Sequence, residues 1–500
     1  MLKKTILNPT YRYVFILVAV SLLIRLLSIG SNDLLVEEAY YWNYAAHLDI
    51  GYLDHPPMVA VLIKLSTMLF GTNEFGVRIP SLLCWLITVF FSMKLTRLIK
   101  PGCAPYALLL LAILPFFFLH SLVITPDIPL IACWSAALYF LYRALVLDHA
   151  SSWYMAGTWL GLGMLSKYSI VLLGPATLLY SIITPEARKW FSRKEPYACL
   201  FITAALFTPV IYWNATHEWA SFAFQSTRRF HATDSFSLHQ LLGLFVIFLT
   251  PLGVLGFWEM LRKNAPEKHQ VDNKTVSFLK VFTLTPLVVF SLFSVTHMIK
   301  FNWIGPGLLA MIPWLAILLN ESTPTTRKAS FVTAVILLMA YSAMIFCMVS
   351  GYPNQINLRL FSKYIAWNDL TRQIHAVAKG VEDHLGTSPL IVPLDLYNIG
   401  SELSFYQAQF LKHKQIKTVY KIIGRDRFGH DSLMYQYWSK DEAIAGKILI
   451  LISEKSTDFH TPEVTTRVTA QSAPIALWSH SQGASSKIRA YYYQIVRMNG

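Results

Sequence analysis

Long apolar runs separated by short polar segments fill the chain as far as Val349. Because a helix needs about 20 apolar residues to cross a bilayer, we predict an α-helical polytopic membrane protein with about eleven or more spans. Two of the runs, Trp153–Leu165 and Ile170–Ile183, are short enough to be merged or broken. The predicted spans lie near Tyr11–Ile29, Ile79–Leu98, Tyr106–Leu122, Ile128–Leu147, Trp153–Leu165, Ile170–Ile183, Ala198–Trp213, Leu238–Met260, Val276–Val295, Trp303–Leu319 and Phe331–Val349.

The pattern changes after Val349. Pro389–Pro393 and Lys447–Ile452 are short continuous apolar runs, which are typical of buried strands, and Ser401–Phe410 has a helical pattern. We therefore predict two domains. They are a transmembrane domain at residues 1–349 with an outer loop at 30–78, and a soluble α/β domain at residues 350–500.

Composition supports the membrane assignment. Of the 500 residues, 54% are hydrophobic and only 14% are charged, whereas charged residues make up about a quarter of a soluble globular protein. The net charge of +14 comes from short basic clusters between apolar runs, a distribution that indicates membrane topology and no nucleic-acid partner. The five cysteines lie in or beside apolar runs without paired spacing, so neither a disulfide framework nor a zinc motif is predicted.

The basic clusters also predict an orientation. If the N-terminus is cytoplasmic, most basic residues of the first 349 positions fall in inside segments, as the positive-inside rule requires. An odd number of spans then places residues 350–500 on the outer face. The inside residues are Lys3, Lys4, Arg12, Lys94, Arg97, Lys100, Arg143, Arg188, Lys189, Arg193, Lys194, Arg262, Lys263, Lys268, Lys274, Arg327 and Lys328.

In this topology every polar loop with reactive side chains opens on the same outer face. Nucleotide sugars and ATP are absent there, so transfer chemistry needs a donor delivered through the membrane, and a lipid-linked donor is the simplest. The loops are Glu37–His55, Thr125–Asp127, Ser166–Tyr168, Trp213–Asp234 and His297–Trp303.

The first of these loops, within Asp33–Pro57, has the side chains of a site that handles a sugar beside a lipid. Carboxylates accept protons from hydroxyls, aromatic rings stack on the apolar faces of sugars, and an imidazole can reach a phosphate. The loop holds the adjacent carboxylates Glu37 and Glu38, the aromatic residues Tyr40, Tyr41 and Trp42, and then Asp54 and His55 before a Pro-Pro pair.

The same loop resembles the first outer loop of family 39 glycosyltransferases of the GT-C group. The resemblance is stronger to the bacterial branch that modifies lipopolysaccharide than to the eukaryotic protein mannosyltransferases, whose extra domain is missing here. The segments that carry it are Glu37–Trp42, Gly51–Met58, Thr125–Leu130, Gly161–Tyr168, Trp213–Ala215 with His217 and Trp219, Lys300–Trp303 and, more weakly, Asp395–Tyr397 and Leu403–Tyr406.

The resemblance implies a GT-C fold and an inverting displacement. An acceptor oxygen attacks the anomeric carbon of a sugar on an undecaprenyl-type polyprenyl phosphate, and the lipid phosphate leaves. A base must take the proton of a hydroxyl acceptor, and cations must stabilise the charge on the leaving phosphate. The implied acceptor is lipid A or lipopolysaccharide core, on the periplasmic face of the bacterial inner membrane.

The resemblance assigns roles to three acidic residues. Glu37 is the predicted base, and Glu38 orients it or binds the acceptor. Asp127 is the third predicted catalytic carboxylate, although its position at the start of a span also suits a helix cap. The family usually has Asp-Glu where this chain has Glu37-Glu38.

Further residues are predicted to bind the donor phosphate or the substrates. Lys167 is the first phosphate ligand, although a lysine near the interface can also extend its ammonium group to the membrane surface. Tyr40 and His55 stand where the aminoarabinose-transferring branch has Arg and Lys, which argues against the same sugar and acceptor. The phosphate-binding set is Lys167, His55, Tyr168 and Lys300; the substrate-binding set is Tyr40, Tyr41, Trp42, Asp54, Asn214, His217, Arg228, Arg229 and Trp303.

Two alternatives remain open at this point. A protein O-glycosyltransferase would use the same chemistry, and a transporter or flippase for a lipid-linked sugar would also place polar residues at membrane depth. The ionisable residues gather at one face and no half-repeat is visible, which favours the enzyme. No cofactor is predicted; a divalent metal remains possible, but no HxxH or similar ligand spacing supports it. Membrane lipids are expected partners.

Overall fold

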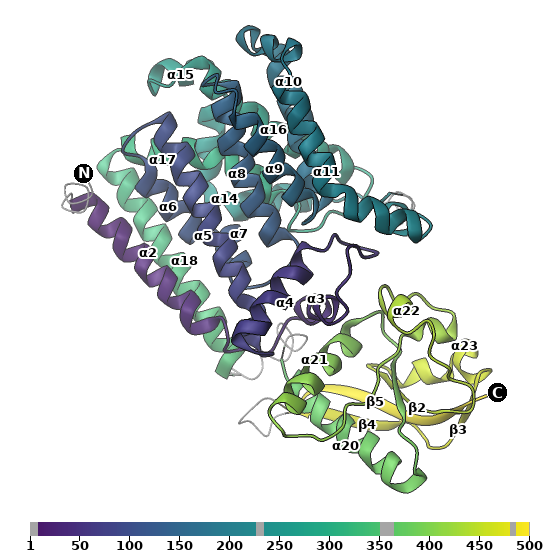
Figure 1. Cartoon of the computed structure of the whole chain (residues 1–500). Helices are drawn as coiled ribbons and strands as arrows, with labels where there is room; N and C mark the ends of the chain where they lie inside the picture. Colours follow the sequence, from purple (N-terminus) through teal and green to yellow (C-terminus); the bar gives the residue numbers. More distant parts are fainter. Residues whose placement is uncertain (1–8, 227–234, 351–364, 481–486, 500) are drawn as a thin grey trace. The chain divides into compact units, whose positions relative to one another are not determined.

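The computed structural model describes residues 9–226, 235–350, 365–480 and 487–499. They form two compact units. The helical unit comprises Met1–Leu27, Ile50–Val59 and Ile79–Ser342, and the mixed unit comprises Ser28–Asp49, Ala60–Arg78 and Ala343–Gly500. Figure 1 shows the course of the chain through both. Within the outer loop predicted at 30–78, residues 50–59 belong to the helical unit, and residues 30–49 and 60–78 belong to the mixed unit.

Helices make up nearly all of the helical unit. Figure 1 shows α5, α6 and α8 running side by side through it. Its elements are α2 (Pro9–Ser28), α5 (Glu74–Ile99), α6 (Ala104–Ile113), α7 (Pro115–His120), α8 (Asp127–Leu145), α9 (Ser152–Met164), η1 (Tyr168–Leu172), α10 (Leu173–Ile183), η2 (Pro185–Ser192), α11 (Glu195–Thr216), α12 (Ala220–Gln225), α14 (Leu238–Leu261), α15 (Ala265–Lys268), α16 (Asn273–Ser294), η3 (Gly305–Met311), α17 (Ile312–Glu321) and α18 (Pro324–Ser350).

Seven helices among the described residues, α2, α5, α8, α11, α14, α16 and α18, are long and apolar enough to cross a membrane. Each matches one of the predicted spans, and the polytopic helical fold is confirmed. The other four predicted spans are short or broken, so the count of about eleven stays a prediction. The run from Tyr106 breaks at Leu114, where Pro115 starts α7, and α10 continues into η2 through a bend of 115°.

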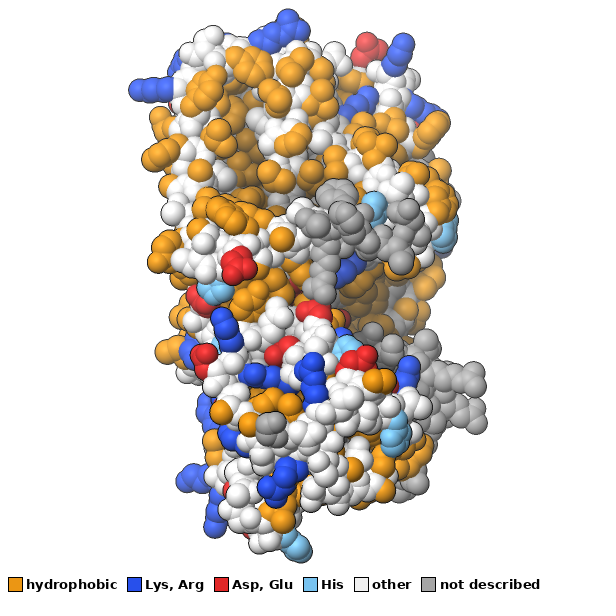
Figure 2. Space-filling view, turned by 90° about the vertical axis from the view of Figure 1, so that its right-hand side faces the viewer, with side chains coloured by type: hydrophobic (Ala, Val, Ile, Leu, Met, Phe, Trp, Pro, Cys, Tyr) orange, Lys and Arg blue, Asp and Glu red, His pale blue; other side chains and the backbone are white. Residues whose placement is uncertain are grey.

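The outside of the helical unit is apolar. Leu200 and Phe201 on α11 are 68% and 74% exposed, a pattern expected for side chains that face lipid. Figure 2 shows hydrophobic side chains over this unit and Lys and Arg gathered at its upper end. Which end of the helical unit faces the cytoplasm stays a prediction from the positive-inside rule.

The mixed unit contains one sheet. β1 (Leu390–Pro393) pairs in parallel with β2 (Ile448–Ser453), and β2 pairs antiparallel with β5 (Lys487–Met498). β3 (Val468–Ala470) and β4 (Ile475–His480) both pair with β5. Every residue of β1 and β2 is buried, as predicted from their continuous apolar runs. The predicted α/β character of this region is confirmed.

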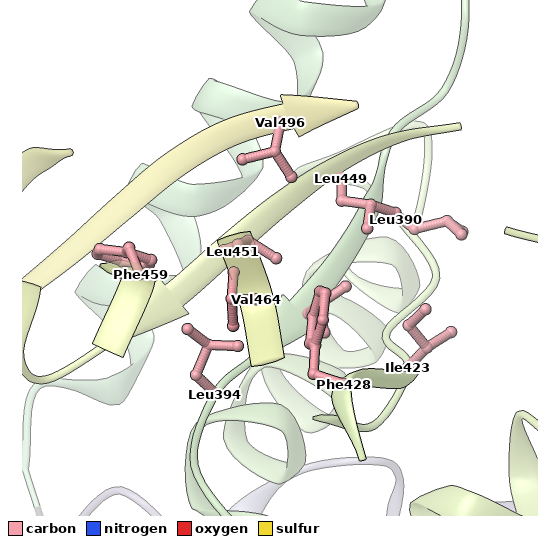
Figure 3. Packing of buried hydrophobic residues seen from close by; sticks show 10 residues of the cluster. Leu390, Leu394, Ile423, Phe428, Leu449, Leu451, Phe459, Val464 and Val496 are labelled. Atoms are coloured by element: carbon pink, nitrogen blue, oxygen red, sulfur yellow. The ribbon is translucent and has the colours of Figure 1, made fainter. Parts of the chain in front are cut away.

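A compact apolar core lies against this sheet. Figure 3 shows Leu449 and Leu451 of β2 and Val496 of β5 packing with Phe428, Phe459 and Val464. The remaining helices of the unit are α3 (Val36–Ala46), α4 (Met58–Phe70), α20 (Trp367–Leu385), α21 (Asn398–Lys412), η5 (Arg425–Phe428), α22 (Tyr435–Trp438), η6 (Ser456–His460) and α23 (Pro462–Thr465).

Helix α3, which carries Glu37 and Glu38, packs along α21. Asn43 of α3 donates to the carbonyl oxygen of Ser401 at 3.2 Å, and the backbone N–H of Leu34 donates to the hydroxyl of Tyr406 at 3.1 Å. Helix α3 is thus part of the folded core of the mixed unit and is held by a helix nearly 360 residues later in the chain.

A buried carboxylate, Glu402 of α21, lies next to this contact. Glu402 is fully buried, and neither carboxylate oxygen has a hydrogen-bond partner among the described residues. Burial raises the pKa of Glu402 well above its usual value, and the nearby acids Asp33, Glu38 and Glu74 raise it further. Glu402 is therefore protonated in the folded state at pH values where the unfolded chain has already lost this proton.

Replacement of Glu402 by Gln should stabilise the protein at neutral pH. A raised pKa means that the folded state binds a proton that the unfolded chain loses above about 4.5, so stability falls as pH rises through this range. Thermal unfolding of the full chain in detergent should show a higher midpoint for Glu402→Gln at pH 7.5 and no gain at pH 4. The exposed Glu463→Gln is the matched control. Equal midpoints for Glu402→Gln and the wild type at pH 7.5 would contradict this assignment.

Candidate functional site

Two charged side chains meet inside the helical unit. Asp127, the first residue of α8, accepts a hydrogen bond and ion pair from the Nζ of Lys167 at 2.7 Å. The residues are 2% and 9% exposed. A buried ion pair persists only where each charge has a partner, since taking either charge out of water is costly. Lys167 thus pairs with Asp127 and does not extend to the membrane surface, and Asp127 makes no side-chain cap bond to α8.

The second oxygen of Asp127 is held by Asn302, whose Nδ2 donates to Oδ2 at 2.6 Å. Asn302 lies in the short segment before η3, and its own Oδ1 is buried without a hydrogen-bond partner among the described residues. The hydroxyl of Thr125, two residues before Asp127, is also buried without such a partner. Unpaired polar atoms beside a buried ion pair are typical of a site that a ligand completes.

His120 lies within electrostatic range of both charges of this pair. Its Nδ1 is 2.9 Å from the carbonyl oxygen of Phe116, so the neutral ring carries its proton on Nδ1 and has a lone pair on Nε2. The ring also packs on Phe116 and Phe301. Asp127, Lys167, Asn302 and His120 together form what we call the ion-pair centre.

The segment at residues 50–59 is fixed near this centre. Gly51 lies so close to Trp213 that a Cβ would stand 2.6 Å from the indole, and the backbone N–H of Met58 donates to the carbonyl oxygen of Leu165 at 2.9 Å. Asp54 is buried and its carbonyl oxygen accepts a hydrogen bond from Gln225. His55, half-buried, lies between these anchors, one of which is two residues from Lys167.

Other predicted site residues on this unit have mainly structural contacts. Tyr168 shares a hydrogen bond of 2.9 Å with Ser221. Asn214 is buried and accepts from the backbone N–H groups of Ser221 and Phe222, so it joins α11 to α12. His217 stacks on Trp213 with ring centroids 4.1 Å apart. The substrate contacts of Tyr168, Asn214 and His217 stay predictions.

Lys300 and Trp303 flank Asn302 in one turn, in which the backbone N–H of Trp303 donates to the carbonyl oxygen of Lys300. The side chain of Lys300 is exposed, and the ring of Trp303 packs on Phe290 and Phe293. Trp303 thereby anchors the turn on α16, and Asn302 makes the contact with Asp127.

In the mixed unit, Glu38 is bound by Arg78. Both carboxylate oxygens lie 2.7–3.0 Å from guanidinium nitrogens, and the backbone N–H of Leu35 donates to Oε2 at 2.9 Å. Arg78 also donates to the carbonyl oxygens of Asn32 and Asp33. The structure therefore gives Glu38 a structural partner, and its predicted role beside Glu37 stays untested. Glu37 is half-buried on the same helix.

The predicted stacking residues of α3 are packed against their own unit. Tyr40 is 1% exposed, lies 4.6 Å from the ring of Tyr397 and accepts a hydrogen bond from the backbone N–H of Met434. Tyr41 is also buried, and Trp42 packs on Phe405. These contacts are structural, and stacking of Tyr40, Tyr41 and Trp42 on a sugar remains a prediction.

Two predicted substrate residues, Arg228 and Arg229, lie outside the described residues. Within the described ranges, no group of three or more His, Cys, Asp or Glu side chains is arranged to hold a metal ion.

Sequence reasoning missed Asn302, His120 and Arg78 as site or supporting residues. Asn302 stood inside the Lys300–Trp303 motif, and this position was the signal that could have identified it. His120 is embedded in an apolar run, and Arg78 is 40 residues from its partner, so only the fold brings each to its neighbours.

Comparison with known proteins gives three similarities. Residues 54–213 match the family described as dolichyl-phosphate-mannose-protein mannosyltransferase. The chain is 22% identical to the lipid A galacturonosyltransferase RgtD of Rhizobium johnstonii, over 88% of this chain and 90% of RgtD. Asp54, His55, Asp127 and Lys167 lie inside the family match.

The fold is that of ArnT from Cupriavidus metallidurans. The TM-score is 0.66 for ArnT bound to undecaprenyl phosphate and 0.62 for apo ArnT, at 15% and 14% identity, and each alignment covers 99% of both chains. These similarities confirm the predicted resemblance to GT-C glycosyltransferases that modify lipid A.

Breaking the ion pair on one side should destabilise the helical unit more than removing both charges. Lys167→Met leaves the buried Asp127 without its cation and should cost about 3 to 5 kcal/mol. The double variant Lys167→Met with Asp127→Asn should recover part of this loss. Thermal or chemical unfolding in detergent measures both. Strictly additive effects of the two substitutions would show that the groups do not interact.

Proposed function

We propose that this chain is a membrane glycosyltransferase that moves a sugar from a polyprenyl phosphate of the undecaprenyl type to lipid A or lipopolysaccharide core. The observation that carries the proposal is the buried ion-pair centre of Asp127, Lys167 and Asn302 in a fold that ArnT also has. ArnT has been crystallised with undecaprenyl phosphate, and RgtD is a lipid A galacturonosyltransferase. Both names support a lipid phosphate donor and a lipid A acceptor.

The chemistry requires a cation at the leaving group. An acceptor oxygen forms a bond to the anomeric carbon, the bond from that carbon to the phosphate oxygen breaks, and polyprenyl phosphate leaves with the electron pair. Lys167 provides the positive charge that stabilises this phosphate, and Asp127 with Asn302 keeps the ammonium group in place when no donor is bound. The Nε2 of His120 and the half-buried side chain of His55 are two further groups that could donate a hydrogen bond or a proton to this phosphate.

The acceptor proton needs a base if the acceptor is a hydroxyl, and we assign this role to Glu37. Glu38 is held by Arg78, and Glu37, half-buried on the same helix, is the carboxylate at the position that the resemblance to family 39 transferases assigns to the base. The loss of a general base lowers the rate by about a hundredfold to ten-thousandfold. An acceptor phosphate on lipid A would need no base.

The proposal places the active site and residues 350–500 on the periplasmic face of the bacterial inner membrane. The basic end of the helical unit, with α15, Lys100 and the start of α18, is then cytoplasmic. Asp127 lies at the opposite end of α8 from Arg143, which agrees with a site that opens away from the basic end.

A protein acceptor is the second candidate. The match to the protein mannosyltransferase family covers residues 54–213 only, whereas the match to the lipid A transferase spans 88% of the chain. The lipid acceptor is therefore favoured. A transporter of lipid-linked sugars is disfavoured because the named relatives are transferases.

Deletion of the gene from its source bacterium should remove one sugar mass from lipid A or the core oligosaccharide. Mass spectrometry of both fractions identifies the lost sugar and the acceptor together. Complementation with wild type should restore the mass, and Lys167→Gln should not. Glu463→Gln, an exposed change on the mixed unit, is the control and should restore it. An unchanged glycolipid profile in the deletion strain would contradict the proposal and favour a protein acceptor.

Glu37→Gln tests the base separately. For a hydroxyl acceptor, the initial rate of transfer in membranes should fall at least about a hundredfold while donor binding is retained. Unchanged transfer by Glu37→Gln would overturn the assignment of Glu37 as the base.

A further inference from the structure

An apolar groove of about 230 Å³ lies in the helical unit, and neither Asp127 nor Lys167 lines it. This volume is far larger than the roughly 10 to 15 Å³ that one water molecule needs. Four helices line it, namely α6, α14, α17 and α18. Ile113, Thr250, Leu318 and Leu337 are one lining residue from each.

A break in α14 forms one wall of the groove. Thr250 has φ 62° and ψ 164°, a backbone conformation that is nearly restricted to glycine, and Pro251 follows it. A strained backbone conformation persists only where the surrounding structure holds it in place, and such conformations cluster at binding and active sites. Broken helices at membrane depth commonly line binding sites. Thr250 itself lines the groove.

Helix α18 forms the opposite wall and is held on one stripe only. Ala334, Leu338 and Tyr341 are buried, and the hydroxyl of Tyr341 donates to the carbonyl oxygen of Ile113 at 2.9 Å. The neighbouring stripe of Thr326, Ser330, Thr333 and Leu337 faces the groove instead of another helix. An apolar chain in the groove would complete the packing between α18 and α14.

The groove changes from apolar to polar and basic toward the start of α18. Ser322, Thr326 and Ser330 line this end, and Arg327 and Lys328 lie between them in the chain. Arg327 donates from Nη2 to the carbonyl oxygens of Asn320 and Ser322, and its Nε is buried without a hydrogen-bond partner among the described residues.

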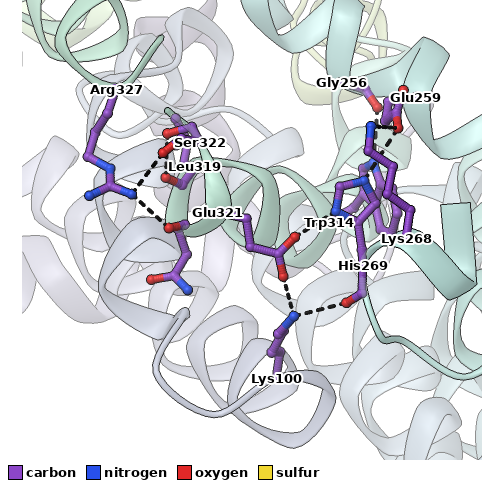
Figure 4. A network of polar contacts seen from close by, with 11 residues as sticks. Lys100, Gly256, Glu259, Lys268, His269, Trp314, Leu319, Glu321, Ser322 and Arg327 are labelled. Carbon is purple, nitrogen blue, oxygen red and sulfur yellow. Dashed lines mark hydrogen bonds and ion pairs between the residues drawn. The ribbon is translucent and has the colours of Figure 1, made fainter. Parts of the chain in front are cut away.

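The acid nearest this end is already neutralised. Figure 4 shows Glu321 between Lys100 and His269, with the Nδ1 of His269 2.6 Å from Oε2 of Glu321. Lys100 also donates to the carbonyl oxygen of His269 at 2.9 Å. Among the residues that the structure describes, neither Arg327 nor Lys328 forms an ion pair with a carboxylate, so their positive charge favours an anion at the polar end.

Packed aromatic rings run from residues beside the groove to His120 of the ion-pair centre. Leu114 and Leu249 line the groove, and the next residues along α7 and α14 toward the centre include Phe116 and Phe248, whose rings pack 5.2 Å apart. The ring of Phe116 also packs on His120. The phosphate site that we infer at Arg327 is built from other residues than the donor phosphate site at Lys167.

We propose that this groove binds an anionic phospholipid from the leaflet at the basic end, with one acyl chain between α14 and α18 and the phosphate near Arg327 and Lys328. The lipid chain fills the space left by the break at Thr250. The headgroup supplies acceptor oxygens to the hydroxyls and to the guanidinium.

Lipid titration of the purified full chain tests this site. After delipidation, native mass spectrometry should show one phosphatidylglycerol bound in preference to phosphatidylethanolamine with the same chains. Leu337→Trp fills the groove and should abolish this binding, whereas Met339→Trp, on an exposed face of the same helix that does not line the groove, should not. Arg327→Gln should reduce the preference for phosphatidylglycerol about fivefold, the effect of one cation near an anionic lipid.

The proposal would be overturned by the absence of a bound lipid at one copy per chain, by equal binding by Leu337→Trp and wild type, or by equal affinity of the wild type for the two lipids. Competition by undecaprenyl phosphate for this site would also overturn it and would assign the groove to the donor tail.

Discussion

The ion pair between Asp127 and Lys167 is the interaction on which the helical unit depends. Each charge is buried among apolar helices, where an isolated charge is unfavourable, so each must keep a partner. The chain satisfies this requirement at irregular points, namely the start of α8, the break between α9 and η1, and the turn that holds Asn302. The polyprenyl phosphate that leaves is a stronger partner for Lys167 than the donor itself, because breaking the bond to the sugar puts a second negative charge on the phosphate oxygens. The scaffold thus holds a cation ready for an anionic donor.

The mixed unit also contains a buried ion pair, between Glu38 and Arg78. Arg78 binds the carboxylate and three backbone carbonyl oxygens of the segment before α3, and in this way fixes the start of that helix. Helix α3 is then positioned by α21, so Glu37 is presented by the same unit that carries the sheet. The unpaired Glu402 beside this contact makes the unit more stable with a proton bound. Helix α3 therefore carries both Glu38, which holds the fold, and Glu37, the proposed base.

Much of the fold could be predicted from the sequence because its strongest signals are local. Seven apolar runs became long helices, and the runs at Leu390 and Ile448 became the buried strands β1 and β2. The runs from Tyr106 and Ile170 were harder, since a proline at Pro115 and a bend after α10 interrupt them. Within the site, Asp127 and Lys167 were recognised by motif, and their direct contact needed the fold. The burial of Tyr40 was not predictable, because its partners Tyr397 and Met434 are far away in the chain.

Binding of undecaprenyl phosphate to purified wild type, Lys167→Gln and Asp127→Asn would test the central claim most directly. Native mass spectrometry or a thermal-shift titration in detergent gives the three dissociation constants. In this account Lys167 binds the donor phosphate, and the Asp127 carboxylate competes with that phosphate for the ammonium group of Lys167. Lys167→Gln should therefore weaken binding at least about tenfold, as expected for a lost charge-assisted hydrogen bond. Asp127→Asn should bind as tightly as wild type or more tightly, because a negative charge near the phosphate is removed. Equal affinity of Lys167→Gln and wild type, or equal weakening by both substitutions, would contradict the account.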